Sequence, residues 1–407
     1  MCQPHIPSRL PVCGNLPAAM SAHPVSRRAV LGAALGTLTA AVAGCDQPQG
    51  VVTGDSGRKG PMPVGVLTDR SGKLKGEGNR YENGLRTGLL WATNRSNLIG
   101  TRRIQPFWHD DAADPDTAAA VAEQLVAHGC KIIVGGSTTA VALRVAEVAA
   151  RHKVIFIAGV PTADSLTGLN RYTFRSGHQD HQDLLTARSL IEPGRRTVVL
   201  TTGNPDTAVS VLRATPVVAP ATADLAPVVA RIKAARPEAL YVSWPLPAPS
   251  LWTALDRAGL LTGIEVVTPL GPRSTWRGYG PDADSLRLVS TYLDGATDNN
   301  AYAALRASVP ARRTDTGHAE GFAAATMVVR ALQFGPDEVE PMVHTLETYR
   351  SGGVKGDMYV RPEDHALIQS MYVAKLTWTG AAGALTAVKT GDLPLAASAP
   401  PVVPMRS

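Results

Sequence analysis

Hydroxyl side chains follow two neighbouring apolar runs in the middle of the chain. The first run, residues 132–134, ends at two glycines, and the second, residues 154–158, ends at a Gly-Val-Pro-Thr segment. Short apolar runs bounded by glycine predict strands that are buried on both faces. In an open parallel sheet, ligands bind outside the carboxyl ends of such strands. We therefore expect half of a ligand site here, formed by Ser137, Thr138, Thr139, Val160 and Thr162.

Helix capping is the alternative explanation for the first three of these side chains. Val141, Val145 and Val148 recur after them at helical spacing, and Ser and Thr are preferred residues at helix N-termini. Thr162 could equally be an ordinary turn residue. The residues alone leave the choice between capping and ligand binding open.

Strand-like and helix-like segments alternate through two stretches of the chain. One begins with the apolar residues 62–67, and the other begins at 197–201 and continues with 239–244 and 265–268. This alternation predicts parallel, doubly wound sheets. A chain of 407 residues with 44% hydrophobic residues can form two cores. We expect an α/β protein of two Rossmann-like lobes, followed by a disordered tail over 386–407.

The N-terminal segment has the pattern of an export signal. Arg27 and Arg28 precede an uncharged apolar run that ends at Cys45, too short for a stable membrane span. The paired arginines favour the twin-arginine route. The Val-Ala-Gly-Cys sequence resembles a lipobox, which predicts lipidation of Cys45 and membrane anchoring. An ordinary signal peptide with an incidental cysteine is the alternative.

We accordingly expect a signal peptide over 1–45, with Met20 as the possible true start, and a flexible tether over 46–60. The signal carries three arginines and no acid, so its removal lowers the formal charge from +6 to +3. That charge is too small to indicate nucleic-acid binding. Histidines are scattered and Cys130 is left alone in an apolar setting, so we expect no metal and no cofactor. No nucleophile–base pair or phosphate loop is present, so we expect no enzyme.

The order of these motifs resembles the type I periplasmic binding proteins, in particular the Leu/Ile/Val-binding protein-like group that binds branched-chain amino acids, amides or urea. The resemblance is carried by residues 110–115, 134–137, 162–167 with 174–175, and 356–360. It implies a Venus flytrap in which three crossover strands join the lobes and the ligand lies in the cleft. Lobe 1 would comprise 61–176 and 294–355, and lobe 2 would comprise 177–293 and 356–385.

The resemblance also implies ligand contacts outside the opening stretch. Ser71 and Glu77 lie in the loop after the first strand, and Trp244 stands where the family places an aromatic that covers the ligand. Leu270 stands where a carboxylate would pair with an α-ammonium. Because an unpaired buried ammonium is costly, Leu270 argues against a standard branched-chain amino acid, unless Glu77 or Asp206 supplies the missing acid.

These expectations together describe an exported solute-binding lipoprotein on the extracytoplasmic face of the cell membrane. As a monomer, it would capture a small polar solute (an amino acid, amide or urea-like molecule) and deliver it to an ABC permease. The alternative is a ligand-sensing or scaffold lipoprotein that kept the fold without transport.

Overall fold

A six-stranded sheet organises the first lobe of the computed structural model, which describes residues 60–310, 313–379 and 384–406. Its strand order is β2-β3-β1-β4-β5-β6, and all neighbours are parallel except β2 and β3. The strands are β1 (Met62–Thr68), β2 (Leu98–Ile99), β3 (Arg102–Asp110), β4 (Ile132–Gly135), β5 (Ile155–Ala158) and β6 (Thr173–Arg175). The predicted signal peptide, Cys45 and residues 46–59 of the predicted tether lie outside the described residues.

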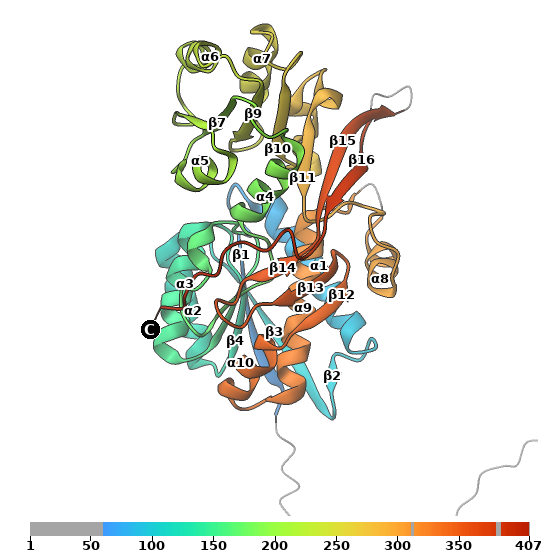
Figure 1. The fold of residues 1–407 in the computed structure, drawn as a ribbon. Helices are drawn as coiled ribbons and strands as arrows, with labels where there is room; N and C mark the ends of the chain where they lie inside the picture. Colours follow the sequence, from blue (N-terminus) through green and yellow to red (C-terminus); the bar gives the residue numbers. More distant parts are fainter. Residues whose placement is uncertain (1–59, 311–312, 380–383, 407) are drawn as a thin grey trace, which may run out of the picture. The chain divides into compact units, whose positions relative to one another are not determined.

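Helices cover both faces of this sheet, because its strands carry apolar side chains on both sides (Figure 1). One core contains α1 (Lys75–Ala92), α9 (Thr316–Phe334) and α10 (Val339–Glu347). The other contains α2 (Pro115–Ala127) and α3 (Thr139–His152). A further helix, α8 (Asn300–Ser308), contributes to a smaller cluster with α9.

Close packing of α1 on α9 depends on glycine. A Cβ atom at Gly84 would lie 2.0 Å from the carbonyl oxygen of His318, and one at Gly321 would lie 2.0 Å from the carbonyl oxygen of Tyr81. Any larger residue would therefore push the helices apart. This contact fixes the first turn of α9 against α1.

A seven-stranded sheet organises the second lobe, in the order β16-β15-β11-β10-β9-β7-β8. The neighbours among β8, β7, β9, β10 and β11 are parallel. The pairs β11–β15 and β15–β16 are antiparallel. The strands are β7 (Thr197–Thr201), β8 (Thr215–Val218), β9 (Ala239–Ser243), β10 (Glu265–Pro269), β11 (Arg287–Ser290), β15 (Met371–Thr379) and β16 (Ala384–Leu393).

Helices again pack on both faces of the second sheet. Residues of α6 (Leu225–Ala234) and α7 (Pro249–Arg257) lie in one core, and residues of α4 (Asp180–Leu190) and α5 (Asp206–Leu212) lie in the other. Three short 3-10 helices are η1 (Asp164–Leu166), η2 (Arg273–Tyr279) and η3 (Ala283–Ser285). The chain passes between the two sheets three times, after β6, after β11 and before β15. The predicted fold class is confirmed.

The lobe boundary expected at residue 355 is wrong. A small antiparallel sheet forms from β12 (Arg350–Gly353), β13 (Gly356–Val360) and β14 (Leu367–Gln369). Met358, Val360 and Leu367 pack in the core of the first lobe. Because their apolar side chains fill that core, the chain joins the second sheet only at β15.

The tail over 386–407 was expected to be disordered, and this is also wrong for its described residues. β16 pairs along the length of β15 as a hairpin (Figure 1). After β16, the carbonyl oxygens of Pro400 and Pro401 accept hydrogen bonds from Arg361 at 2.6 and 3.2 Å. Val403 N–H donates to Asp364 at 3.0 Å. The segment is rich in Pro and Ala, a composition that is typical of disorder. It is nevertheless ordered because its backbone groups form hydrogen bonds, and these cannot be predicted from composition.

Candidate ligand-binding site

A small cavity lies where β1, β4 and β5 end, at the first turn of α1. It is lined by Thr68, Asp69, Leu74, Glu77, Gly78, Tyr81, Gly135, Gly136, Ser137 and Val160, and its volume is about 10 Å³. That volume is at the limit for a single water molecule. Three predicted site residues meet here: Glu77, Ser137 and Val160.

Asp69 shapes the loop that leads from β1 into the cavity. Its buried carboxylate accepts hydrogen bonds from the N–H groups of Ser71 and Leu74 at 3.2 and 2.7 Å. A carboxylate that accepts several backbone N–H bonds stabilises a tight loop. The predicted site residue Ser71 is exposed in this loop and does not line the cavity.

Ser137 uses both of its hydrogen-bond donors within the protein. Its N–H donates to Asp111 Oδ2 at 2.9 Å and its hydroxyl donates to Asp111 Oδ1 at 2.7 Å. Burial raises the pKa of Asp111, while the hydrogen bonds from Ser137 act in the opposite direction. The side chain expected to grip a ligand therefore already serves to hold α3 to the loop after β3.

Thr138 caps α3, which is the alternative that the sequence left open. Its hydroxyl oxygen accepts the N–H of Val141 at 3.2 Å, and Thr139 is the first residue of the helix. Thr162 lies in the loop between β5 and β6 and does not line the cavity. Its carbonyl accepts the N–H of Asp180 at 2.8 Å.

The predicted contacts from the second lobe follow the carboxyl ends of their strands. Trp244 comes directly after β9 and Leu270 directly after β10, and both are half-buried against the second-lobe core. Neither lines the first-lobe cavity. The structure thus brings together three of the nine predicted residues in one cavity and leaves the others around it.

A family model described as "Periplasmic binding protein" matches residues 61–384. The chain belongs to the periplasmic binding protein family. The predicted resemblance is confirmed at this level, and the match extends over both lobes.

Two curated relatives of this periplasmic binding protein match it over shorter stretches. The Leu/Ile/Val-binding protein BraC3 of Rhizobium johnstonii is 25% identical over 133 residues, which are 32% of this chain and 36% of that protein. A Leu/Ile/Val-binding protein homolog of Brucella melitensis is 28% identical over 123 residues, covering 30% and 33%. The chain therefore spans about a third of the length of these relatives.

Solved structures match the periplasmic binding protein over most of its length. An ABC-type branched-chain amino acid transporter protein from Rhodopseudomonas palustris is 26% identical, with a TM-score of 0.74, and the match covers 84% of this chain and 99% of that one. A solute-binding protein from R. palustris in complex with 4-hydroxybenzoate has a TM-score of 0.72 at 16% identity, covering 82% and 97%. At 16% identity, the match to the 4-hydroxybenzoate complex shows only that the two proteins share a fold.

Buried charges of the binding protein surround the first crossover. Arg175, which is 1% exposed, donates to the carbonyl oxygens of Ala163 and Pro161 at 2.7 and 2.8 Å. Lys355 Nζ donates to the carbonyl oxygen of Ser176 at 2.6 Å. Burial lowers the pKa of Lys355 to about 8, against the opposing effect of Glu320. These cations hold the loop after β5 and the start of the crossover through backbone carbonyls.

His178 adds a charged pair to the same crossover. Its Nε2 lies 3.0 Å from Asp183 Oδ2, and its Nδ1 lies 3.8 Å from Glu320 Oε1. Burial lowers the pKa of His178, but the two carboxylates outweigh burial and raise that pKa to about 10. The imidazolium is therefore charged at neutral pH.

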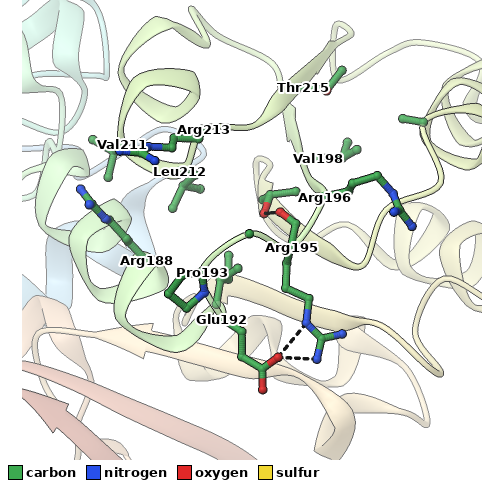
Figure 2. Close-up of a pocket in the computed structure, with 14 residues that line it drawn as sticks. Arg188, Glu192, Pro193, Arg195, Arg196, Val198, Val211, Leu212, Arg213 and Thr215 are labelled. Carbon is green, nitrogen blue, oxygen red and sulfur yellow. Dashed lines mark hydrogen bonds and ion pairs between the residues drawn. The ribbon is translucent and has the colours of Figure 1, made fainter.

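A wider cavity of about 490 Å³ lies in the second lobe, away from the carboxyl ends of the strands (Figure 2). Its lining includes Arg188, Arg195, Arg196 and Arg213. α4, α5 and α6 end at this cavity, and cations are favoured near helix C-termini. Arg195 also pairs with Glu192 at 2.6 Å. Helix ends account for Arg188 and Arg213, and ion pairs with Glu192 and Glu238 account for Arg195 and Arg196, so we assign them no ligand.

Sequence reasoning missed Asp69, Asp111 and Tyr81 as parts of the site. Asp114 caps the helix that begins at Pro115, accepting the N–H of Thr117 at 2.7 Å. Asp111 instead reaches Ser137, which is 26 residues away.

Within the described residues, no group of three or more His, Cys, Asp or Glu side chains is arranged to hold a metal ion. No helix of the described ranges is long and apolar enough to span a membrane.

Proposed function

We propose that this protein is the solute-binding component of an ABC importer, exported and held at the extracytoplasmic face of the membrane as a monomer through lipidated Cys45. The observation that carries the proposal is the match to 99% of the solved chain described as an ABC-type branched-chain amino acid transporter, at 26% identity and a TM-score of 0.74. The three passages of the chain between the two sheets support it, since hinged closure around a ligand is the working motion of such proteins.

In this proposal the solute lies between the ends of the first-lobe strands and the loops after β9 and β10. Glu77 and Val160 would contact it from one side, and Trp244 and Leu270 from the other. All four residues lie at or beyond carboxyl ends of parallel strands, where ligands of such sheets bind. Closure follows if the solute makes better contacts in the closed state than in the open one.

The chemistry of this set favours a solute without a free ammonium group. Leu270 provides no carboxylate, and an ammonium buried without a counter-charge costs several kcal/mol. Glu77 is a poor substitute, because its Oε1 already pairs with Arg80 Nη1 at 3.1 Å. We therefore propose a small polar solute such as an amide, a urea-like molecule or a carboxylate.

Isothermal titration calorimetry of the purified full-length protein tests this function. The panel comprises leucine, isoleucine, short amides, urea, and small aliphatic and aromatic acids. We expect saturable binding of at least one class, weakened by Leu270→Ala and unchanged by Leu98→Ala, which truncates an exposed leucine on the first lobe. A folded protein that binds no member of the panel would contradict transport and favour the sensing or scaffold alternative.

A further inference from the structure

A third cavity also borders the start of α1. Its volume is about 430 Å³, and it is lined by Gly76 and Arg80 from α1, Arg273 and Ser274 from η2, and Arg313, Asp315 and His318 at the start of α9. Glu77, which lines the small first-lobe cavity, lies between Gly76 and Arg80 in sequence. The two cavities are therefore neighbours on one helical turn.

The single carboxylate of this lining is committed to other groups. Asp315 caps α9 by accepting the N–H of Thr316 at 3.0 Å, and it also accepts the N–H of Arg273 at 2.9 Å. Arg80 Nε lies 3.4 Å from the same carboxylate. Glu77, outside the lining, also pairs with Arg80 at 3.1 Å. Three arginines therefore face two acids, and the cavity keeps one net positive charge.

Two of the arginines have unused binding capacity. The guanidinium of Arg273 lies 4.4 Å from the ring centroid of Trp276, and its buried Nε has no hydrogen-bond partner. Among the described residues, no carboxylate lies within ion-pair distance of the Arg273 or Arg313 guanidinium. A planar guanidinium presents paired donors that match a carboxylate.

His318 provides a second sign that a partner is missing. It is 4% exposed and lines the cavity, and its Nδ1 makes no hydrogen bond within the described part of the chain. Burial, together with the charge of Arg80, lowers the pKa of His318 to about 4. Such a buried polar side chain is costly when it remains unpaired. The positive end of the 19-residue helix α9 adds to the same field.

The loop after β10 also favours an anion. Residues 270–274 of this loop include Arg273 and no acidic residue. In the first lobe, the N–H and hydroxyl of Ser137 are already donated to Asp111. Donors for a negatively charged group are thus scarce in the small cavity and abundant in this one.

We propose that the cavity formed by Arg80, Arg273, Arg313 and His318 binds the carboxylate of the transported solute, which is an organic acid with an apolar body and no ammonium. This inference rests on the proposed transport function and names its solute class. Arg273 and Arg313 would supply the charged hydrogen bonds, while Trp244 and Leu270 would cover the apolar body.

Calorimetry with matched probes tests the proposal on the full-length protein. The probes are 4-methylpentanoate and benzoate, their neutral amides, and leucine, which adds an ammonium to 4-methylpentanoate. We expect an acid to bind about tenfold or more tightly than its amide and than leucine. Equal affinity for an acid and its amide, or binding of leucine alone, would overturn the carboxylate assignment while leaving the transport function intact.

Substitutions of the cavity arginines test whether the acid binds in this cavity. Arg273→Gln and Arg313→Gln should each weaken binding of the acid about tenfold, and leave binding of the amide within about twofold. Arg257→Gln, an exposed charge on α7, should change neither. Arg313 is exposed, so its variant keeps the test valid if Arg273→Gln unfolds. Acid binding that survives both substitutions would overturn the proposed site. Binding of no probe or panel member would overturn both this inference and the transport function.

Discussion

Asp111 accepts both hydrogen bonds that Ser137 can donate, at 2.9 Å from the N–H and 2.7 Å from the hydroxyl. The pair joins the loop after β3 to the turn before α3, and Asp111 is fully buried. Two loops at the carboxyl edge of the first sheet are thereby fixed to each other. The Ser137 side chain, which was expected to contact the ligand, therefore holds this edge of the sheet in place.

Asp111→Asn should therefore destabilise the protein. The amide oxygen can keep only one of the two Asp111 oxygen positions, which accept the N–H groups of Ser137 and Ala113 at 2.9 Å each. One of these N–H groups would then face the amide nitrogen and be left unpaired. We expect a loss of about 1–3 kcal/mol in the free energy of unfolding, measured by urea denaturation. Asp116→Asn, at an exposed position of α2, should stay within about 0.5 kcal/mol of the parent protein. An equal effect at both positions would contradict the assigned role.

Arg175→Lys should weaken the loop that follows β5. A lysine cannot reproduce the fork that contacts the carbonyl oxygens of Ala163 and Pro161. We expect a loss of about 2 kcal/mol in the free energy of unfolding, because buried acceptors become unpaired. Arg195→Lys, whose exposed partner is Glu192, provides the matched control and should be nearly neutral. Equal stability of the Arg175 variant and the parent would show that the fork is dispensable.

His178 makes stability depend on pH in the alkaline range. Its folded pKa of about 10 exceeds the ordinary value of 6.5, so the folded state retains a proton that the unfolded state has lost. Stability is then complete below about pH 6.5 and falls as pH rises. Lys355 has the opposite sign, because its folded pKa of about 8 lies below the ordinary 10.5, and it increases stability with pH above about 8.

The clearest window for this effect is therefore pH 6.5 to 8. Urea denaturation of the parent protein should show stability falling through it, and His178→Gln should flatten that slope. The buried environment also contains Asp183, Glu320, Asp180 and Arg175, whose charges set the size of the effect. His344→Gln, at a side chain that is 79% exposed, should keep the parent slope. A slope that survives in the His178 variant would assign it to another group.

The C-terminal segment should contribute to stability. Ser398 is fully buried, and its hydroxyl donates to the carbonyl oxygen of Gln369 at 2.6 Å. Ser398→Ala should lower the free energy of unfolding by about 1 kcal/mol, whereas Ser210→Ala, at an exposed position of α5, should have little effect. No difference between the two variants would mean that the segment is not docked in solution.

Lipidation predicts the distribution of the protein between cell fractions. Cys45→Ala should move the protein from the membrane fraction to the soluble extracytoplasmic fraction, because the acyl chains would be lost. Cys130→Ala changes the buried cysteine of the first lobe and should leave the distribution unchanged. Retention of the Cys45 variant in membranes would contradict lipid anchoring.

The fold class could be predicted because strand and helix periodicity is local. Strand-like runs such as residues 132–134 and 265–268 form β4 and β10. The site could be predicted only in part, since its contacts are not local. Arg80 bonds Ser274 across 194 positions, and Asp111 bonds Ser137 across 26. Composition also failed for residues 394–406, whose backbone accepts and donates bonds that no residue-type pattern reveals.

The docking of the last residues has a practical consequence for fluorescent reporters. The N–H of Arg406 donates to the carbonyl oxygen of Gly168 at 2.9 Å, and β1 begins the first sheet at Met62. Labels attached near residues 60 and 406 would therefore both belong to the first lobe, and their energy transfer would not follow a closing motion. A label near residue 60 paired with one at Lys233 on α6 would connect the two lobes and provide a direct optical signal of solute capture.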